Sequence, residues 1–329
     1  GTGGFYERRA LSESGKNERT GDPVSHQDLF QTFTVAENRK ENYRVRTLVL
    51  DASLPAAQPG QFIMAWLPGI GEKPFSVAAA DPLTLTIAAV GPLSEALCRL
   101  PMGARLWVRG PFGQGFKQEG KKLLLVGGGY GAAPLRFLAQ EGLRVGAKVS
   151  VCLGAKTADD LLLAEGFRSL GCTVWTATED GSAGMKGLVT GAVEAALRDF
   201  RADGLYACGP KPMLLALVEL CRKHELPGQF SWEALLRCGL GLCGNCELDE
   251  ETCQAAGIPT GWLTCKDGPV SFLPLPGAEP VEAKGEEVCL LSGVIPSEAR
   301  NLGQYNNGVH QRLDIRPRSF LTLLVRITK

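Results

Sequence analysis

Four cysteines late in the chain have a spacing suited to an iron–sulfur cluster. Cys238, Cys243 and Cys246 form a C-x4-C-x2-C motif, and Cys265 follows after a further 18 residues. [2Fe–2S] sites of the plant type use this C-x4-C-x2-C…C spacing, in which one loop supplies three thiolates and the fourth arrives from elsewhere. Glycines at 239, 241 and 244 allow the loop to curl tightly and to turn backbone N–H groups toward sulfur. The spacing therefore predicts a [2Fe–2S] site.

Two alternatives to this ligand set stay open. Structural zinc usually takes paired C-x2-C or His ligands, which the C-x4-C arm fits poorly. Cys253 could replace Cys265 as the fourth ligand, but it would leave only six residues after Cys246, so we favour Cys265. The other cysteines are expected to be small buried hydrophobic residues or residues without a role, at positions 98, 152, 172, 208, 221 and 289.

A glycine string lies between a predicted strand and a predicted helix. The segment contains Gly127, Gly128, Gly129 and Gly131, and Pro134 follows in the expected first helical turn. Backbone amides and a helix N-terminus at such a turn suit a pyrophosphate. The string departs from strict G-x-G-x-x-G spacing, so a tight turn without a ligand is the alternative.

Other motifs lie at places where an α/β sheet and a barrel bind ligands. Cys208-Gly209-Pro210 ends the last predicted parallel strand, at the sheet edge where open α/β sheets bind ligands. Earlier in the chain, Lys73 precedes Pro-Phe-Ser, and Ser94 stands near the start of a short helix. A cation and a hydroxyl beside a helix N-terminus suit a second phosphate-bearing cofactor. A solvated surface lysine and an ordinary helix cap are the alternatives for these two residues.

The elements that must position these motifs fall into two patterns. Short strands broken by Gly and Pro turns run over 31–36, 43–50, 61–66, 75–79, 84–90 and 105–108, which predicts an antiparallel barrel. From residue 122 apolar strands alternate with helices, which predicts a parallel sheet with crossover helices. We therefore expect an α+β multidomain chain with a flexible arm (1–27), an antiparallel Greek-key barrel (28–120), an α/β nucleotide-binding domain (121–228), a cluster module (229–273) and a tail outside the fold (274–329).

Composition excludes several classes of protein. The 329 residues are 44% hydrophobic, and Lys+Arg and Asp+Glu each total 35, so neither disorder nor a nucleic-acid partner is expected. No apolar run approaches the roughly 20 residues of a membrane span, and we expect no membrane association. Eleven cysteines are too few for a secreted disulfide scaffold, which favours a cytoplasmic protein.

Together the motifs resemble a known family. KPFS, VGPLSEAL, GPFGQGF, LLLVGGGYGAAPL and YACGPKPM resemble the ferredoxin–NADP reductase superfamily. The segment RCGLGLCGNC followed by CKDGPV resembles the electron-transfer subunits of type B, NAD-dependent dihydroorotate dehydrogenase. This resemblance covers residues 28–273. Lys73 stands where the family usually has Arg, and the segment between the third and fourth cysteines is longer than the family leads us to expect.

The resemblance implies FAD in the barrel and NAD in the α/β domain, with Cys208 near the nicotinamide and no certain catalytic residue. The implied FAD residues are Lys73, Pro74, Phe75, Ser76, Thr86, Ile87, Ala88, Gly91, Leu93 and Ser94. The implied NAD residues are Gly127, Gly128, Gly129, Gly131, Cys208, Gly209 and Pro210. NAD is favoured over NADP because the loops after the second and third parallel strands carry Lys156 and Lys186 without an arginine cluster, and Glu179-Asp180 would repel a 2′-phosphate.

The implied activity is that of an oxidoreductase subunit in pyrimidine (UMP) biosynthesis. Electrons from a partner FMN-containing dihydroorotate dehydrogenase subunit would cross the [2Fe–2S] cluster and FAD to NAD⁺, because a flavin exchanges both hydride and single electrons. A separate partner is required, since the chain has no room for an eight-unit βα barrel, and a heterotetramer of two copies of each is expected. The alternatives are a sulfhydrogenase or ferredoxin:NADP oxidoreductase flavin subunit, a free-standing NADH reductase serving an oxygenase, and a non-enzymatic iron–sulfur carrier or sensor.

Overall fold

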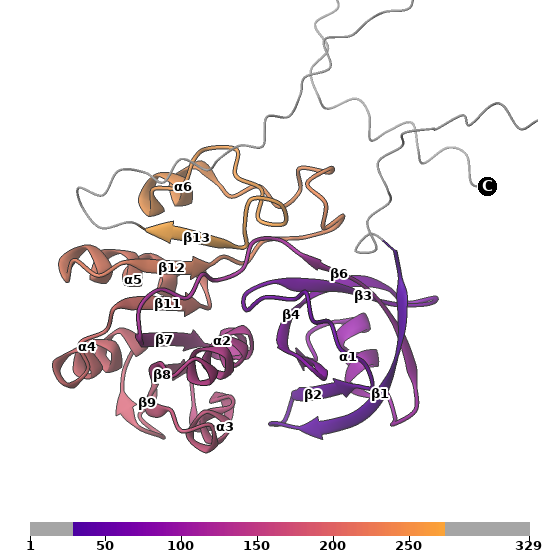
Figure 1. The fold of residues 1–329 in the computed structure, drawn as a ribbon, viewed down its shortest axis with the longest axis horizontal. Helices are drawn as coiled ribbons and strands as arrows, with labels where there is room; N and C mark the ends of the chain where they lie inside the picture. Colours follow the sequence, from indigo (N-terminus) through magenta and orange to yellow (C-terminus); the bar gives the residue numbers. More distant parts are fainter. Residues whose placement is uncertain (1–28, 274–329) are drawn as a thin grey trace, which may run out of the picture. The chain divides into compact units, whose positions relative to one another are not determined.

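The computed structural model describes residues 29–273. The arm predicted over 1–27 and the tail predicted over 274–329 lie outside these residues. Figure 1 shows a barrel followed along the chain by a sheet flanked by helices.

The first part of the chain folds as a closed six-stranded antiparallel barrel with strand order β1-β2-β5-β4-β3-β6. Its strands are β1 (Gln31–Lys40), β2 (Val45–Leu50), β3 (Phe62–Leu67), β4 (Gly71–Ala80), β5 (Leu83–Ala88) and β6 (Arg105–Phe112). Consecutive hairpins join β3, β4 and β5, while β2 lies beside β5 and β6 beside β3, which is a Greek-key arrangement. The predicted barrel is confirmed.

The barrel encloses its own apolar core. Inward side chains alternate with outward ones along the strands, and Leu48, Ile63, Leu85 and Ile87 are fully buried in this core. The short helix α1 (Pro92–Cys98) covers the core through the buried Leu97.

The second part is a seven-stranded sheet with order β10-β9-β8-β7-β11-β12-β13. Its strands are β7 (Lys122–Gly128), β8 (Lys148–Ala155), β9 (Thr173–Thr178), β10 (Met185–Lys186), β11 (Gly204–Cys208), β12 (Gly228–Ser231) and β13 (Val270–Leu273). All neighbours are parallel except β12 and β13. The predicted parallel sheet with crossover helices is confirmed.

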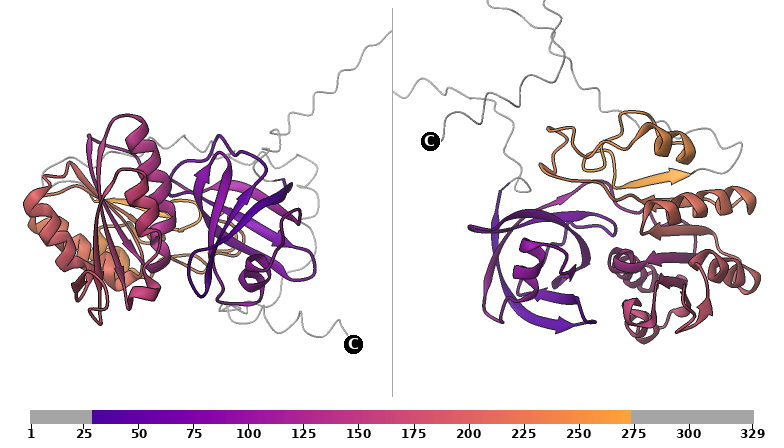
Figure 2. Two further views of the ribbon diagram at one scale, coloured as in Figure 1. Left: turned by 90° about the horizontal axis from the view of Figure 1, so that it is seen from below. Right: turned by 180° about the vertical axis from the view of Figure 1, so that it is seen from behind.

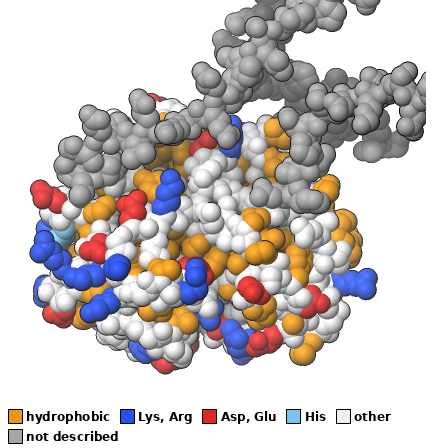
Figure 3. Space-filling view, in the orientation of Figure 1, with side chains coloured by type: hydrophobic (Ala, Val, Ile, Leu, Met, Phe, Trp, Pro, Cys, Tyr) orange, Lys and Arg blue, Asp and Glu red, His pale blue; other side chains and the backbone are white. Residues whose placement is uncertain are grey.

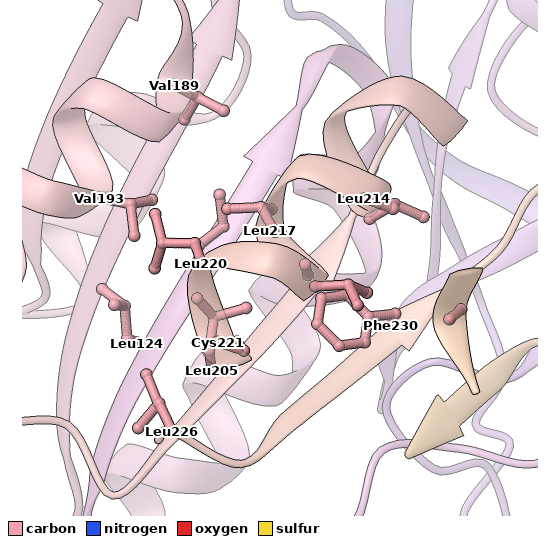
Figure 4. Packing of buried hydrophobic residues seen from close by; sticks show 14 of the residues in the cluster. Leu124, Val189, Val193, Leu205, Leu214, Leu217, Leu220, Cys221, Leu226 and Phe230 are labelled. Carbon is pink, nitrogen blue, oxygen red and sulfur yellow. The ribbon is translucent and has the colours of Figure 1, made fainter. Parts of the chain in front are cut away.

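Helices cover both faces of this sheet, as Figure 2 shows. They are η2 (Gly129–Gly131), α2 (Ala132–Arg144), η3 (Ala158–Asp160), α3 (Ala164–Ser169), α4 (Val189–Asp199) and α5 (Lys211–Lys223). The side chains of β7 alternate between the two layers of helices. Leu123 and Leu125 pack with α2 and α3 on one face of the sheet. Leu124 and Val126 pack with α4 and α5 on the other face. Figure 4 shows the second layer, in which Leu214, Leu217 and Cys221 of α5 belong to one buried cluster with Leu205 of β11.

The sheet runs past the boundary at residue 228 that the sequence led us to expect. β12 and β13 add two strands to it, and the cysteine segment lies between them, together with helix α6 (Glu250–Ala256). A segment of this size has too little apolar surface for a core of its own, so the sheet anchors both of its ends.

The face seen in Figure 3 carries Lys and Arg side chains interspersed with Asp and Glu. No helix within residues 29–273 has the length and apolar character needed to cross a bilayer.

Candidate functional site

A cavity of about 500 Å³ opens at the carboxyl ends of the parallel strands. Four strand ends contribute to it through Gly128 at the end of β7, Gly154 and Ala155 of β8, Glu179 after β9 and Pro210 after β11. This edge is where open α/β sheets bind ligands. The barrel reaches the same cavity through Asn42 and Arg44.

Glycines at this edge serve different purposes. Gly129 has a φ of +53° and open space where a side chain would stand, so its backbone faces the cavity. A Cβ on Gly131 would lie 1.9 Å from the carbonyl oxygen of Cys208. A Cβ on Gly128 would lie 2.6 Å from Sδ of Met213. Gly128 and Gly131 are therefore required for the loop to pack on the end of β11 and on α5.

The remaining residues of the predicted NAD set lie close to this loop. Gly127 is buried at the end of β7, where it pairs with Cys208 in the register of β7 and β11. Pro210 precedes helix α5 and lines the cavity, whereas Gly127, Gly131, Cys208 and Gly209 are not among its lining residues. Burial raises the pKa of the Cys208 thiol to about 12, so the group is a neutral thiol at physiological pH.

Glu233 also lines this cavity, although the sequence motifs did not point to it. It follows the end of β12 by two residues and lies close enough to Cys208 for its charge to act on that thiol. Glu233 is exposed as a residue, and partial desolvation of its carboxyl by the surrounding protein raises the pKa of Glu233. A polar residue just after a parallel strand is a recognisable signal, but the sequence did not reveal β12 as part of this sheet.

A second group that the motifs did not indicate joins the barrel to the α/β domain at the cavity rim. Asp160 accepts hydrogen bonds from the Tyr43 hydroxyl at 2.8 Å and from Nη2 of Arg44 at 3.2 Å. The Arg44 guanidinium lies 5.3 Å from the ring centroid of Tyr43 and 5.2 Å from that of Tyr130. The hydrogen bond from Tyr43 is the largest of the contacts that lower the pKa of Asp160.

The predicted FAD residues occupy β4, β5 and the start of α1, and none of them lines the cavity. Lys73 is exposed on β4, and the three residues after it, Pro74, Phe75 and Ser76, are half-buried. Strand β4 contacts α2, and β5 contacts η2. The elements that carry the predicted FAD residues therefore adjoin the predicted NAD residues where the glycine loop leads into α2.

Several side chains of the FAD set have structural partners of their own. Thr86 shares a hydrogen bond with Thr47 across the strands, at 3.1 Å between the hydroxyl oxygens. Ile87 is fully buried in the barrel core and Leu93 is buried in α1. Ala88 packs toward the layer that contains α2. Ile87 and Leu93 therefore shape the barrel, and only their backbones are free to meet a ligand.

Ser94 stabilises the N-terminus of α1. Its hydroxyl accepts from the N–H groups of Val90 and Gly91 and donates to the carbonyl of Gly91, each at 3.0 Å. Gly91 is the residue that precedes the helix. The alternative raised from the sequence is an ordinary N-cap at Ser94, but Gly91 holds that position and Ser94, the third residue of the helix, bonds back to it. This bonding fixes the backbone that a phosphate would approach.

The four predicted cluster cysteines come together as two neighbouring pairs. Cys238 contacts Cys243, and Cys246 contacts Cys265. Backbone N–H groups point at the sulfurs: Gly241 donates to Cys265 at 3.1 Å, and Cys265 donates to Cys246 at 3.4 Å. Leu240 donates to Cys238 at 3.4 Å. Residues 239, 241 and 244 have φ values between +66° and +77°, as the curled loop requires.

The thiols differ in how readily they ionise. Burial acts to raise the pKa of Cys238, but the N–H groups of Leu240 and Cys243 outweigh it and lower that pKa to about 6. Burial and the neighbouring Cys246 raise the pKa of Cys265. Within residues 29–273 no three His, Cys, Asp or Glu side chains converge closely enough to hold a single metal ion.

Cys253 lies apart from these pairs. It is buried on α6 and belongs to the core layer that contains α5, whereas Cys246 and Cys265 pack against the barrel strands β3 and β6. The unexpectedly long segment before Cys265 contains α6, which Asp249 caps by accepting a hydrogen bond from the N–H of Thr252 at 3.0 Å. This placement supports Cys265 as the fourth member of the set.

Comparisons with known proteins agree with this architecture. A sequence profile for the oxidoreductase NAD-binding domain matches residues 125–219. A chain from the structure of NADH-dependent reduced ferredoxin-NADP oxidoreductase superposes with a TM-score of 0.64 at 28% identity, covering 73% of this chain and 87% of that one. The ferredoxin reductase of carbazole 1,9a-dioxygenase superposes with a TM-score of 0.52 at 21% identity, covering 61% of this chain and 68% of that one, which shows a shared fold.

Curated relatives match most of the described residues. The probable dihydroorotate dehydrogenase B (NAD(+)) electron transfer subunit of Thermococcus kodakarensis is 42% identical over 64% of this chain and 83% of its own length. The protein of the same name from Methanocaldococcus jannaschii is 36% identical over 72% of this chain and 87% of its own. The resemblance noted from the motifs is confirmed: the chain belongs to the family of dihydroorotate dehydrogenase B electron transfer subunits.

Proposed function

We propose that this chain transfers electrons from a dihydroorotate-oxidising partner subunit to NAD⁺, as a step of pyrimidine (UMP) biosynthesis. The observation that carries the proposal is the arrangement of three candidate sites in one chain. A cavity for a dinucleotide, a barrel face that adjoins it and a loop of paired thiols against the same barrel correspond to the parts that such a relay needs.

The cavity supports NAD as the nucleotide. The N–H groups around Gly129 and the start of α2 would bind the pyrophosphate. Glu179 lines the cavity after β9, where a carboxylate accepts hydrogen bonds from ribose hydroxyls and repels a 2′-phosphate. NAD is therefore favoured over NADP. Glu233 would place a negative charge near the nicotinamide, and the buried Cys208 thiol would only pack beside it.

The barrel supports FAD. Lys73 is exposed on β4, and Ser94 fixes the backbone at Gly91 where α1 begins, so an exposed cation and the first turn of α1 would meet a pyrophosphate. Contacts of β4 and β5 with α2 and η2 bring this face to the nucleotide cavity.

The paired thiols fit a [2Fe–2S] cluster better than they fit a single ion. Two pairs of cysteines match the two irons of such a cluster, and the N–H groups of Leu240 and Gly241 stabilise thiolate charge. Every cysteine among residues 29–273 is unpaired, which agrees with ligand use and with a reducing, cytoplasmic location. When bound, FAD exchanges hydride with NAD and single electrons with the cluster.

The proposal requires a partner. Residues 29–273 contain no eight-unit βα barrel of the kind that would oxidise dihydroorotate, and we infer that an FMN-containing catalytic subunit supplies the electrons. We expect a heterotetramer with two copies of each subunit.

A second candidate shares the same three sites but serves another partner. The structural match to NADH-dependent reduced ferredoxin-NADP oxidoreductase favours a flavin subunit of that kind. The two candidates differ in the partner protein and in the preferred nucleotide.

The experiment is anaerobic purification of the full chain, followed by analysis for flavin, iron and acid-labile sulfide and by an assay of NADH-dependent dye reduction. We expect FAD, two irons with two sulfides per chain, and faster dye reduction with NADH than with NADPH. A colourless, iron-free protein would contradict the proposal. A loaded protein without dye reduction would indicate an electron carrier or sensor.

A further inference from the structure

Arg109 is the only Lys, Arg, Asp or Glu among residues 29–273 that is buried, with 8% of its surface exposed. It lies on barrel strand β6, opposite Met64 of β3. A buried charge is costly unless it is paired and hydrogen-bonded, so its partners indicate its purpose.

The Arg109 guanidinium joins a carboxylate to the cysteine loop. Nε donates to Oε1 of Glu72 at 2.6 Å, and Nη2 donates to the backbone carbonyl of Cys238 at 2.7 Å. The guanidinium carbon lies 5.2 Å from the ring centroid of Phe112, which adds a cation–π contact. A cation of the barrel is thereby fixed on the backbone of Cys238, the first predicted ligand.

The surroundings of this contact are apolar. Phe62, Met64 and Phe112 of the barrel form one buried cluster with Leu236, Cys246 and Cys265. A Cβ on Gly239, the residue after Cys238, would lie 3.3 Å from Cγ of Met64. The members of this cluster are buried, and a charge acts more strongly beside such apolar surroundings than it does in water.

Packing alone does not explain an ion pair at this place. Apolar residues of similar volume often stabilise a buried seam as well as a buried salt bridge does. The guanidinium instead supplies a positive charge and a hydrogen bond at the loop that would carry thiolate charge. Net charge and hydrogen bonding are among the properties that set the potential of an iron–sulfur cluster.

We propose that Arg109 and Glu72 are positioning residues that hold the Cys238 loop on the barrel and set the reduction potential of the cluster bound there, with opposite effects. Reduction adds negative charge to the cluster, so the Arg109 cation raises the potential and the Glu72 carboxylate lowers it. This inference rests on the proposed function of the cysteine loop.

The test is a redox titration of the full chain, in which the electron paramagnetic resonance signal of the reduced cluster measures the fraction reduced at each potential. In Arg109→Gln we expect the reduction potential of the cluster to fall by about 59 mV. For a one-electron couple, a shift of this size changes the ratio of oxidised to reduced cluster about tenfold at the wild-type midpoint potential. Glu72→Gln is expected to raise the potential.

Arg109→Lys keeps the charge and should recover most of the wild-type value. Arg105→Gln, an exposed arginine on the same strand, is the matched control and should leave the potential unchanged.

The opposite signs separate this role from a merely structural one, because loss of packing would move both variants the same way. Glu72 is on the rim of the seam with 25% of its side chain exposed, so we expect Glu72→Gln to retain the fold even if Arg109→Gln does not. A potential that falls or stays constant in Glu72→Gln overturns the inference. A wild-type chain that binds no cluster overturns the proposed function as well.

The iron-free chain provides a second readout. Hydrogen exchange at the amides of Leu240 and Gly241 should speed up in Arg109→Gln and remain at the wild-type rate in Arg105→Gln. Unchanged exchange in both variants would show that Arg109 does not hold the loop.

Discussion

The N–H of Gly241 donates a hydrogen bond to the Cys265 sulfur at 3.1 Å, although 24 positions separate the two residues. This bond links the loop that carries three of the predicted ligands to the residue that would supply the fourth. Cys253 is nearer in sequence to that loop, yet it packs in a different core layer. The arrangement leads to a direct comparison of two cysteines.

Cys265→Ser should abolish the cluster, whereas Cys253→Ala should retain it. Serine is a poor substitute for a thiolate ligand, while Cys253 acts as a small buried hydrophobic residue. Iron and acid-labile sulfide per chain, together with the visible spectrum, provide the measurement. Loss of the cluster in Cys253→Ala with retention in Cys265→Ser would show that the ligand set is wrong.

Gly131→Ala should destabilise the chain and weaken nucleotide binding. The added methyl group would meet the carbonyl oxygen of Cys208, a backbone atom that cannot move without displacing β11. We expect a loss of about 2–3 kcal/mol in the free energy of unfolding, as for other overpacked sites, measured by urea denaturation.

The matched control is Gly191→Ala. Gly191 lies on α4 with open space at its Cβ position, so this variant should gain about 0.5–1 kcal/mol. Equal stabilities for Gly131→Ala and the wild type would refute the proposed packing role.

Much of this architecture could be predicted from the sequence, and the errors have a common cause. The Greek-key barrel, the parallel sheet and the loop after β7 are encoded by local periodicity and by glycine placement, which a sequence displays directly. The strands β12 and β13 are only four residues each, and they were assigned to the cysteine module because their pairing is a tertiary property.

The same limit applies to the candidate site. The cysteine spacing and the strand-end glycines were evident, but Arg44, Asp160, Glu233 and Arg109 were not, because no motif contains them. Each of them is brought to its place by a contact between segments far apart in the chain. Residues of this kind become visible only when the fold is known.

Glu233→Gln should weaken the binding of NAD⁺ relative to NADH. A carboxylate in the cavity attracts the positively charged nicotinamide of NAD⁺, and about 1 kcal/mol for such a pair corresponds to roughly a fivefold change in Kd. Titration calorimetry with each nucleotide provides the comparison. Glu251→Gln, on the exposed side of α6, is the control and should change neither Kd.

The effect of Glu233 should also depend on pH. Because desolvation raises the pKa of Glu233, its carboxylate charge forms at a higher pH than in an ordinary glutamate. The affinity for NAD⁺ should therefore rise as pH increases through that raised pKa in the wild type and should stay level in Glu233→Gln. Parallel pH profiles of the two proteins would rule out this role.

Glu179→Arg should shift the preference of the chain toward NADP. The carboxylate that lines the cavity after β9 would be replaced by a guanidinium able to pair with a 2′-phosphate. We expect the ratio of kcat/KM for NADPH to that for NADH to rise by roughly tenfold, which corresponds to about 1.4 kcal/mol. Steady-state dye reduction with each nucleotide measures it. An unchanged ratio would mean that the 2′ position lies elsewhere.

The central claim is that this chain delivers electrons from a partner to NAD⁺. Its most direct test is anaerobic co-purification with an FMN-containing dihydroorotate dehydrogenase subunit, followed by measurement of NADH formed on addition of dihydroorotate and NAD⁺. The account predicts a stable complex that forms NADH at a rate that Cys265→Ser abolishes. A partner that never associates, or a complex whose NADH formation is the same without this chain, would contradict it.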